Sequence, residues 1–312
     1  MSTNGKKNWT SADIPSQEGR TAVITGTGGI GYEVALEMTR AGAKVIMAGR
    51  NKVKGEEAIR NVQKQVPEGK IRFEQLDLAD LASVKAFAER LKSREKSLDT
   101  LVNNAAVMNP PQRQVTKDGF ELQLGTNYLG HFALTANLLT LLKKGNHPRV
   151  ITLSSIAHRS GSINFDDLQY ERNYKPMEVY SQSKLACLMF ALELQQKSDA
   201  NGWGINSMAA HPGISRTELI PNGAGKNSRA GIIRLLFGPF LFQPAAHGAW
   251  PPLYAATAID AVGGTYYGPS KMGEMRGYPM VAKIAEQALE KEVAYRLWKE
   301  SEKLTNVTFQ LS

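Results

Sequence analysis

Thr25-Gly26-Thr27-Gly28-Gly29-Ile30-Gly31 is the stretch of sequence that decides the fold. A β-branched run over residues 21–25 leads into it, and residues 30–41 follow with the apolar spacing of a helix. A glycine-rich turn between a strand and a helix lets the backbone approach the phosphates of a dinucleotide. The free N–H groups and the positive dipole end of the helix attract those phosphates. The stretch therefore predicts a dinucleotide-binding unit.

The rest of the chain continues this alternation of short apolar runs and helical patterns. Further strands are predicted over residues 44–48, 71–76, 98–102, 150–153, 205–210 and 264–268, and further helices over 52–66, 81–91, 119–142, 179–196 and 279–302. Strands that alternate with helices pair in parallel and are covered on both faces. The expected fold class is α/β, a Rossmann-type doubly wound parallel sheet flanked by helices on both faces.

The domain organisation is expected to be simple, because no shift in composition marks a boundary. Residues 1–19 are polar and predict a flexible N-terminal lead-in, residues 20–302 a single domain, and residues 303–312 a C-terminal tail. Residues 213–252 are rich in Gly, Pro and mixed apolar residues, which indicates a long irregular excursion. We expect a substrate loop over about 214–252 within it.

Composition excludes several classes of site. The chain is 42% hydrophobic and 21% charged, as in a globular protein with a sizeable core. The single cysteine, Cys187, excludes a disulfide framework and any CxxC metal site, and it is interpreted as a small buried hydrophobe. The five histidines show no metal-ligand spacing, so no metal site is expected.

The net charge of +9 is spread along the chain without a basic block, which favours a polyanionic cofactor over a nucleic acid partner. No apolar run reaches the roughly 20 residues that span a bilayer. The nearest candidate, residues 232–242, contains Arg234 and Pro239 and is interpreted as a buried or lid-like segment over a hydrophobic substrate. Peripheral contact with a membrane surface is the alternative. The N-terminus lacks the apolar core of a secretory signal, so a cytoplasmic location is expected.

The residues after the second strand bear on the choice of cofactor. An Asp or Glu at this place normally binds the ribose 2′-hydroxyl of NAD. Here the chain reads Ala48-Gly49-Arg50-Asn51, with no acid before Glu56. The Arg50 guanidinium suits a 2′-phosphate, although it could also be a solvated surface residue. The sequence therefore favours NADP(H) over NAD(H), with Arg50 and Asn51 at the adenosine end.

Tyr180-Ser181-Gln182-Ser183-Lys184 predicts the chemistry. Residues four apart on a helix share one face, so Tyr180 and Lys184 project together. A free tyrosine, with a pKa of about 10, is a poor acid or base at neutral pH, and a nearby ammonium lowers that pKa. With the glycine turn upstream, the pair indicates hydride transfer between a nicotinamide and a carbonyl or alcohol carbon.

Further motifs follow in order along the chain: Asp77-Leu78, Asn103-Asn104-Ala105-Ala106, Asn127, Ser154-Ser155 and His211-Pro212-Gly213. Together with the glycine turn and the Tyr/Lys pair, this order resembles the short-chain dehydrogenase/reductase family over residues 20–268. Within that family, Thr126-Asn127-Tyr128-Leu129-Gly130-His131-Phe132 and Ser154-Ser155-Ile156-Ala157-His158 are most similar to the retinol-dehydrogenase-like and protochlorophyllide-reductase-like members.

The resemblance implies a role for each matching residue. Ser155, rather than Ser154, would bind and polarise the substrate oxygen. Tyr180 would transfer the proton, Lys184 would tune Tyr180 and hold the nicotinamide ribose, and Asn127 would hold a water in a proton relay. The implied cofactor contacts are Asp77 and Leu78 at the adenine, Asn104 and Ala105 near its ribose with Ala106 beside them, and Pro212, Gly213, Ile214 and Thr217 along the nicotinamide and its phosphate.

Two departures from the family pattern stand out. The glycine loop is one residue shorter than the usual T-G-x-x-x-G-x-G. In addition, 24 residues separate Ser155 from Tyr180, more than in compact members. This insert, with Phe165, Tyr170 and Tyr174, is expected to wall the substrate pocket. Such an insert blocks the usual helix pairing between subunits in some relatives, so a monomer or a homodimer is expected.

The sequence thus predicts an NADP(H)-dependent oxidoreductase that interconverts a bulky hydrophobic ketone or aldehyde and its alcohol. Two alternatives stay open at this point. One is an NADPH-dependent reductase of a conjugated C=C bond on the same fold. The other is a non-catalytic NADP-binding sensor, although such proteins typically lose the tyrosine or the lysine.

Overall fold

The structure is a computed structural model that describes residues 8–214 and 243–309. These residues form one sheet of eight strands in the order β3-β2-β1-β4-β5-β6-β7-β8. The strands are β1 (Thr21–Thr25), β2 (Lys44–Gly49), β3 (Ile71–Gln75), β4 (Thr100–Asn103), β5 (Arg149–Leu153), β6 (Asn206–Ala210), β7 (Tyr266–Lys271) and β8 (Arg276–Val281). The first seven strands pair in parallel and β8 pairs antiparallel with β7.

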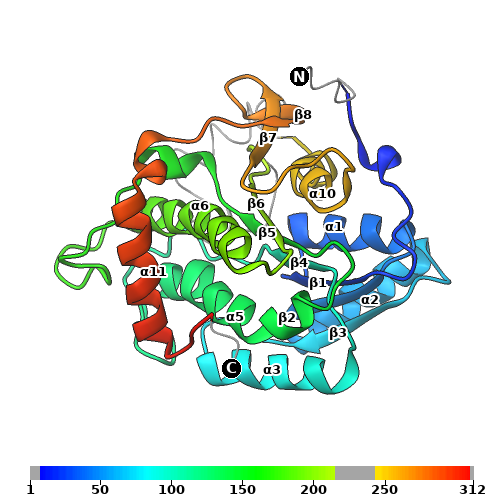
Figure 1. Cartoon of the computed structure of the whole chain (residues 1–312), viewed down its shortest axis with the longest axis horizontal. Coiled ribbons are helices and arrows are strands. Elements are labelled where there is room, and N and C mark those ends of the chain that lie inside the picture. Colours follow the sequence, from blue (N-terminus) through cyan, green and yellow to red (C-terminus); the bar gives the residue numbers. More distant parts are fainter. Residues whose placement is uncertain (1–7, 215–242, 310–312) are drawn as a thin grey trace.

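Helices cover both faces of this sheet (Figure 1). They are α1 (Gly29–Arg40), α2 (Lys52–Gln65), α3 (Leu81–Arg94), α4 (Leu122–Leu124), α5 (Gly130–Leu142), α6 (Pro176–Asn201), α9 (Ala245–Gly248), α10 (Trp250–Thr257) and α11 (Lys291–Thr305). Single turns η1 (Ser11–Asp13), η2 (Gly125–Leu129), η3 (Ile156–Ser160) and η4 (Glu286–Leu289) lie between them. The doubly wound α/β prediction is confirmed.

Two cores follow from the alternation of side chains along each strand. Ile24 of β1 faces the core formed with α1, α2 and α10, where Val34 and Leu253 are fully buried. Val23 faces the opposite core, formed with α3, α5, α6 and α11, which contains Phe132 and Trp298. Buried on both faces, the strands read as nearly continuous apolar runs, as parallel strands do.

The candidate site lies where the strand order reverses, between β1 and β4. Ligands bind at such a switch point, outside the carboxyl ends of the strands. The predicted motifs follow those ends: the glycine turn comes after β1, Asn104 after β4, Ser155 after β5 and Pro212 after β6. The topology therefore gathers residues from across the chain at one edge of the sheet.

Helix α6 carries the Tyr/Lys pair and is longer than the sequence predicts. Pro176 occupies its first turn, where its missing N–H costs nothing. Gly202 ends it in the left-handed region, with φ of 63°. Residues 179–191 are buried all round the helix, which explains why no amphipathic pattern marks its full length.

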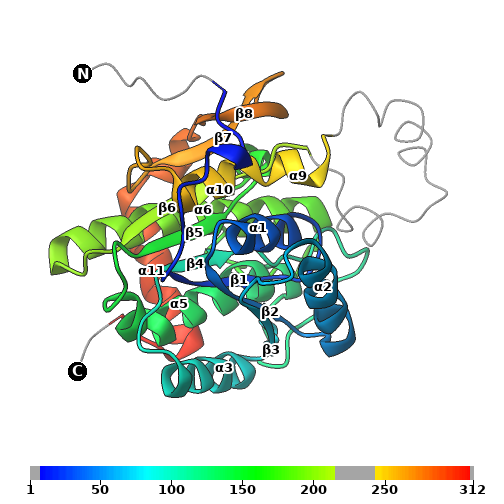
Figure 2. The same ribbon diagram turned by 90° about the vertical axis from the view of Figure 1, so that its right-hand side faces the viewer.

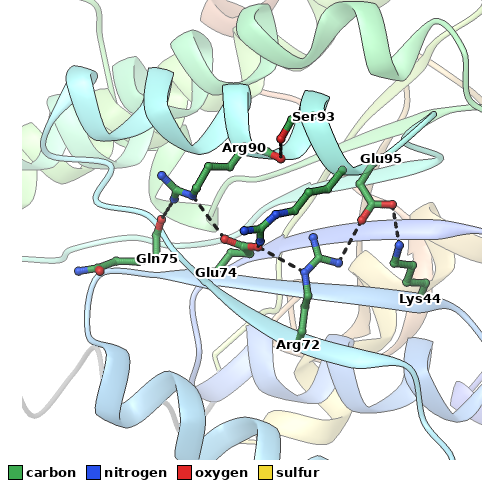
Figure 3. A network of polar contacts seen from close by, with 8 residues as sticks. Lys44, Arg72, Glu74, Gln75, Arg90, Ser93 and Glu95 are labelled. Atoms are coloured by element: carbon green, nitrogen blue, oxygen red, sulfur yellow. Dashed lines mark hydrogen bonds and ion pairs between the residues drawn. The ribbon is translucent and has the colours of Figure 1, made fainter.

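The edge strand β3 is protected by charge (Figure 3). The buried Glu74 carboxylate on β3 pairs with Arg94 at 2.6 Å, and with Arg90 and Arg72 at about the limit of contact, 3.5 and 3.4 Å. Beside it, Glu95 pairs with Lys44 of β2 at 2.7 Å and with Arg72 at 3.1 Å. Charged side chains on an edge strand disfavour pairing with another chain, and each buried carboxylate here has a cationic partner.

The prediction of a helix over residues 279–302 is wrong in its first half. Residues 276–281 form β8, which returns antiparallel along β7 through a turn with positive φ at Met272, Gly273 and Glu274. Pro279 is tolerated there because β8 is an edge strand. The helix itself, α11, begins only at Lys291. Figure 2 shows β7 and β8 at the top of the molecule, next to α9 and α10.

Three other expectations also change. Part of the expected lead-in is packed on the domain, because Trp9 is buried against Tyr254, with ring centroids 5.4 Å apart. The expected tail is partly structured, because α11 continues to Thr305 and Phe309 packs on Trp298. The irregular excursion ends early, since α9 and α10 occupy residues 245–257. The rest of the expected substrate loop, residues 215–242, and Thr217 with it, lie outside the described residues.

Candidate active site

The glycine turn between β1 and α1 leaves no room for side chains. Gly26 has φ of 93° and Gly29 of 53°, in the region that favours glycine. A Cβ placed on Gly31 would lie 2.5 Å from Nδ2 of Asn104 and 2.6 Å from the Gly26 carbonyl oxygen. The loop, one residue shorter than the family pattern, thus closes tightly against β4. Gly28, at the N-cap of α1, offers no capping side chain, so the first N–H groups of the helix suit an anionic ligand.

Thr25 fixes this turn to the end of β4. Its Oγ1 accepts the N–H groups of Asn104 at 2.9 Å and Ala105 at 3.0 Å, while Nδ2 of Asn104 donates to the Thr25 carbonyl at 2.7 Å. Nε2 of His131 lies 2.8 Å from Thr25 Oγ1, and its Nδ1–H donates to the Asn127 carbonyl at 2.9 Å. Burial lowers the pKa of His131 to about 4, which keeps the ring neutral and able to accept from Thr25.

The residues predicted at the adenosine end occupy the tips of β2 and β3. Arg50 is exposed directly after β2, where the Thr27 methyl group packs against Gly49. Asn51 uses its side-chain oxygen to cap α2 by accepting the N–H of Lys54 at 3.0 Å. Asp77 fixes the turn after β3, because Oδ1 accepts the Ala79 N–H at 3.0 Å. The neighbouring Leu78 is 6% exposed and belongs to the core.

Tyr180 and Lys184 lie together on α6, both almost completely buried. The Lys184 ammonium is 5.8 Å from the centroid of the Tyr180 ring. It donates to the Leu153 carbonyl at 3.0 Å, at the carboxyl end of β5. The cation is therefore anchored between the sheet and the tyrosine, as the predicted proton donor and activator require.

The two serines after β5 differ in what they can do. The Ser154 hydroxyl donates to the Lys184 carbonyl at 2.7 Å and is buried. The Ser155 hydroxyl oxygen accepts the N–H of Ala157 at 3.2 Å, which leaves its proton available for an acceptor in the cavity. This difference supports the second serine as the one that binds a substrate oxygen.

Asn127 lies in η2, a π-helical turn, a feature that is frequent at functional sites. Its side chain accepts the N–H of Val107 at 2.8 Å and donates to the Val107 carbonyl and to Ser183 Oγ, both at 3.0 Å. Its carbonyl accepts from His131 and, at 3.2 Å, from the buried thiol of Cys187. The side-chain contacts hold the segment after β4 in place, and the water relay stays a prediction.

These elements surround one cavity of about 850 Å³. It brings together Ile30, Asn104, Ala106, Ser154, Ser155, Tyr180, Lys184, Pro212, Gly213 and Ile214. Ala105 and Asn127 are not on its wall, and neither are Arg50, Asn51, Asp77 and Leu78, which lie farther along the strand ends. The cavity therefore combines three of the predicted catalytic residues, Ser155, Tyr180 and Lys184, with the nicotinamide end of the predicted cofactor site.

The sequence did not predict most of the substrate side of the cavity. The lining residues that we did not predict are Met108, Leu153, Ile156, Ala157, Arg159, Ser160, Met177, Glu178 and Ser181. Met177 lies three residues before Tyr180 and Ser181 four residues after Met177, so their spacing on the helix could have indicated them. Nothing in the sequence marked Met108, because it lies on the irregular segment after β4.

The prediction that the insert walls the pocket is confirmed for its two ends, residues 156–157, 159–160 and 177–178, but its aromatic residues are not on the cavity wall. Phe165 packs under the guanidinium of Arg296, 4.0 Å from the ring centroid. The Tyr174 hydroxyl accepts from Nε2 of Gln123 at 3.3 Å, and burial raises the pKa of Tyr174 to about 12. Tyr170 is buried within the insert and is likewise absent from the cavity wall. These rings pack the insert onto the domain.

Among residues 8–214 and 243–309, no three His, Cys, Asp or Glu side chains gather in a way that could hold a metal ion. Among the same residues, none of the helices combines the length and apolar character needed to cross a membrane.

Comparison with known proteins agrees with this geometry. The family model described as short chain dehydrogenase matches residues 20–224. Mouse retinol dehydrogenase 13 is 39% identical over 303 residues, covering 95% of this chain and 86% of the relative, and mouse polyprenol dehydrogenase is 38% identical over 299 residues, covering 94% and 85%. The chain therefore belongs to the short-chain dehydrogenase family, and its sequence is retinol-dehydrogenase-like.

Solved structures share the fold. A protein of uncharacterized function from Mycobacterium paratuberculosis is 40% identical, with a TM-score of 0.81, and the match covers 97% of this chain and all of that one. A short chain dehydrogenase from Shigella flexneri complexed with NADP is 20% identical, with a TM-score of 0.63, over 81% of this chain and 97% of that one.

Proposed function

We propose that this protein is an NADP(H)-dependent oxidoreductase that interconverts a bulky hydrophobic ketone or aldehyde and its alcohol. One observation carries the proposal: Ser155, Tyr180 and Lys184 converge on a largely apolar cavity that also reaches the glycine turn. A proton donor and a hydrogen-bond donor thus face the place where a nicotinamide would lie.

The residues at the glycine turn fit a dinucleotide. Gly26 and Gly31 let the turn pack directly against Asn104, and the uncapped start of α1 leaves N–H groups available to a pyrophosphate. Asn104 and Ala106 continue from the turn into the cavity, and Pro212, Gly213 and Ile214 line the cavity wall. The cofactor, when bound, supplies or accepts the hydride.

The protein's own part is orientation and proton transfer. Ser155 donates its hydroxyl proton in a hydrogen bond to the substrate oxygen, because Ala157 already occupies one acceptor site of that hydroxyl. Tyr180 transfers the proton to or from the same oxygen. The Lys184 ammonium, anchored on Leu153, stabilises the phenolate that forms when Tyr180 gives up its proton.

The preference for NADP(H) rests on Arg50. It is exposed at the end of β2, next to the glycine turn, where a guanidinium can pair with a 2′-phosphate. The first acid downstream, Glu56, lies a full turn into α2 and pairs with Lys52 at 3.7 Å. No carboxylate stands directly after β2 to hold a ribose 2′-hydroxyl.

The substrate class rests on the walls of the cavity. Met108, Ile156, Ala157 and Met177 give it an apolar lining. A cavity of about 850 Å³ is large for a small polar carbonyl even with the nicotinamide inside it. The names of the relatives, retinol dehydrogenase and polyprenol dehydrogenase, also support a bulky apolar alcohol or its carbonyl product.

The test is the oxidation of NADPH in the presence of a panel of bulky ketones, aldehydes and enones, with NADH in parallel. We expect turnover of bulky ketones or aldehydes with NADPH and much slower turnover with NADH. Turnover of enones alone would favour reduction of a conjugated C=C bond. Tight binding of NADPH without turnover of any compound, or turnover of small polar carbonyls alone, would contradict the proposal.

A further inference from the structure

We propose that His158 is a positioning residue that fixes Ser155 for hydrogen bonding to the substrate and couples this serine to the C-terminal segment of the chain. The inference rests on the proposed function, because it takes Ser155 as the group that binds the substrate oxygen. It concerns a histidine that lies behind the cavity wall and is not among the residues that line the cavity.

Ser155 directly follows the last hydrogen bond between β5 and β6. The N–H of Ser154 donates to the Ala210 carbonyl at 2.8 Å, the last rung between β5 and β6. Ser155 itself is the N-cap of η3 and follows that rung. Its carbonyl accepts the backbone N–H of His158 at 3.0 Å and, from the same residue, the ring Nδ1–H at 2.6 Å. Both contacts of the serine carbonyl therefore come from His158.

The two ring nitrogens of His158 have different partners, which fixes the tautomer. Nδ1 faces the Ser155 carbonyl, which can only accept, and Nε2 faces the backbone N–H of Ala285 at 3.3 Å, which can only donate. The neutral ring must therefore carry its proton on Nδ1. Burial lowers the pKa of His158, so the neutral form is favoured. Tyr266 stands edge-on to the ring, with centroids 5.3 Å apart, and limits its rotation.

The partner of Nε2 belongs to a distant part of the chain. Ala285 precedes η4, and Gln287 in η4 donates from Nε2 to the carbonyls of His158 at 3.3 Å, Arg159 at 3.0 Å and Gly161 at 3.1 Å. Residues 285–287 therefore hold the whole of η3 from behind. Because Ile156, Ala157, Arg159 and Ser160 of η3 line the cavity, this segment supports both the serine and one wall of the site.

Two substitutions of His158 test the contacts of its two ring nitrogens separately. The amide nitrogen of His158→Asn occupies about the place of Nδ1 and keeps a donor to the Ser155 carbonyl, but it loses the acceptor for Ala285. The amide oxygen of His158→Gln can reach the place of Nε2 and accept from Ala285, but it leaves the Ser155 carbonyl without its side-chain donor. The pair is matched in polarity and differs mainly in which contact survives.

We expect kcat to fall by about tenfold or more in His158→Gln, since small misplacements of a reacting group cost up to about a hundredfold. In His158→Asn we expect kcat to stay within about threefold of the unsubstituted protein, since the bond to Ser155 is kept. The KM for NADPH should be unchanged in both variants. A merely structural role would instead lower the melting temperature and kcat of the two variants to the same extent, and that result would overturn the proposal.

The tautomer gives a readout that does not depend on activity. A long-range ¹H–¹⁵N spectrum of the imidazoles should show a neutral, Nδ1-protonated ring whose signal is absent from His158→Asn. A ring protonated on Nε2 would overturn the proposal even if no substrate were known. Failure of the unsubstituted protein to reduce any carbonyl would contradict the proposed function instead. If His158→Gln does not fold, Gln287→Ala takes its place. A fall in kcat of about threefold or more would then support the coupling, and an unchanged kcat would overturn it.

Discussion

Two parts of the cavity and its surroundings differ in whether main chain or side chains form them. On the side of the glycine turn, main chain packs against main chain, and Gly31 and Asn104 are too close for even one added carbon. Elsewhere, the wall of the cavity includes long side chains such as Met108, Arg159 and Met177. The first surface is set by the path of the backbone and tolerates little change. The second can be altered by substitution without moving the sheet.

Tyr180 lines the cavity as the proposed proton donor, and its loss should have the largest effect. In Tyr180→Phe the proton donor is removed while the ring still packs on α6. We expect kcat to fall by roughly 10²- to 10⁴-fold, the usual contribution of general acid–base catalysis, with NADPH binding unchanged. Steady-state kinetics and fluorescence titration measure the two quantities. Tyr174→Phe, in the insert and outside the cavity, is the control. Unchanged turnover in Tyr180→Phe would remove this residue from the mechanism.

At the glycine turn, we expect the addition of a single methyl group to weaken the binding of NADPH. In Gly31→Ala the new Cβ must displace the Gly26 carbonyl and the Asn104 amide. We expect the Kd for NADPH to rise by about 10- to 100-fold, the equivalent of a typical overpacking cost. Glu37→Ala, which removes a partly buried ion pair with Arg40 on the same helix, should leave the Kd unchanged. Equal affinities in the two variants would show that the glycine turn is not the phosphate cradle.

His131, which is buried behind the glycine turn, should make the free energy of unfolding depend on pH. The pKa of His131 is lowered from 6.5 to about 4, so the unfolded state binds the proton first as the pH falls. Its contribution is complete above pH 6.5 and is lost progressively towards pH 4. Between pH 7 and pH 5 the loss should be about 2 kcal/mol of unfolding free energy. Urea unfolding at both pH values measures it, and His131→Gln should show a smaller difference than the unsubstituted protein. Identical pH dependence in both proteins would contradict this assignment.

The same contrast explains how much of the molecule could be predicted from the sequence. The βα units and the glycine turn follow local rules of periodicity and turn chemistry, and the structure agrees with them. The hairpin of β7 and β8 does not, because Pro279 and the residues after it carry a helical pattern that pairing with β7 overrides. Met108 and Arg159 reach the cavity from irregular segments, whose paths are set by tertiary contacts. Thr25 and His131, 106 positions apart, meet only in the folded chain.

Arg50 lies at the end of β2, next to the glycine turn, where the recognising group is a side chain. Arg50→Ala should lower the preference for NADPH over NADH by roughly tenfold, because a charge-assisted hydrogen bond contributes about 1.5–3 kcal/mol and an exposed one lies at or below that range. The ratio of kcat/KM for the two cofactors is the measurement. Lys52→Ala, two residues away, removes the same charge and is the control. An equal loss of preference in both variants would mean a general field effect instead of direct pairing.

Substitution of Met177 at the cavity wall should have the smallest effect on kcat/KM and the most selective one. Met177 is 44% exposed at the cavity wall, so a bound substrate would cover only part of its side chain. Met177→Ser removes apolar contact worth about 1 kcal/mol, and we expect kcat/KM to fall about fivefold for bulky apolar substrates. Small carbonyls that do not reach Met177 should be unaffected.

Met280→Ser is the matched control for this change. Met280 is 43% exposed on β8, outside the cavity, so it undergoes the same substitution at nearly the same exposure. If both variants reduce kcat/KM equally, the effect comes from the general loss of apolar surface. If Met177→Ser lowers kcat/KM for small and bulky substrates alike, the side chain supports the position of Tyr180, three residues along α6, and does not select the substrate. Only a loss confined to bulky substrates would show that this side of the cavity recognises its ligand through exchangeable side chains.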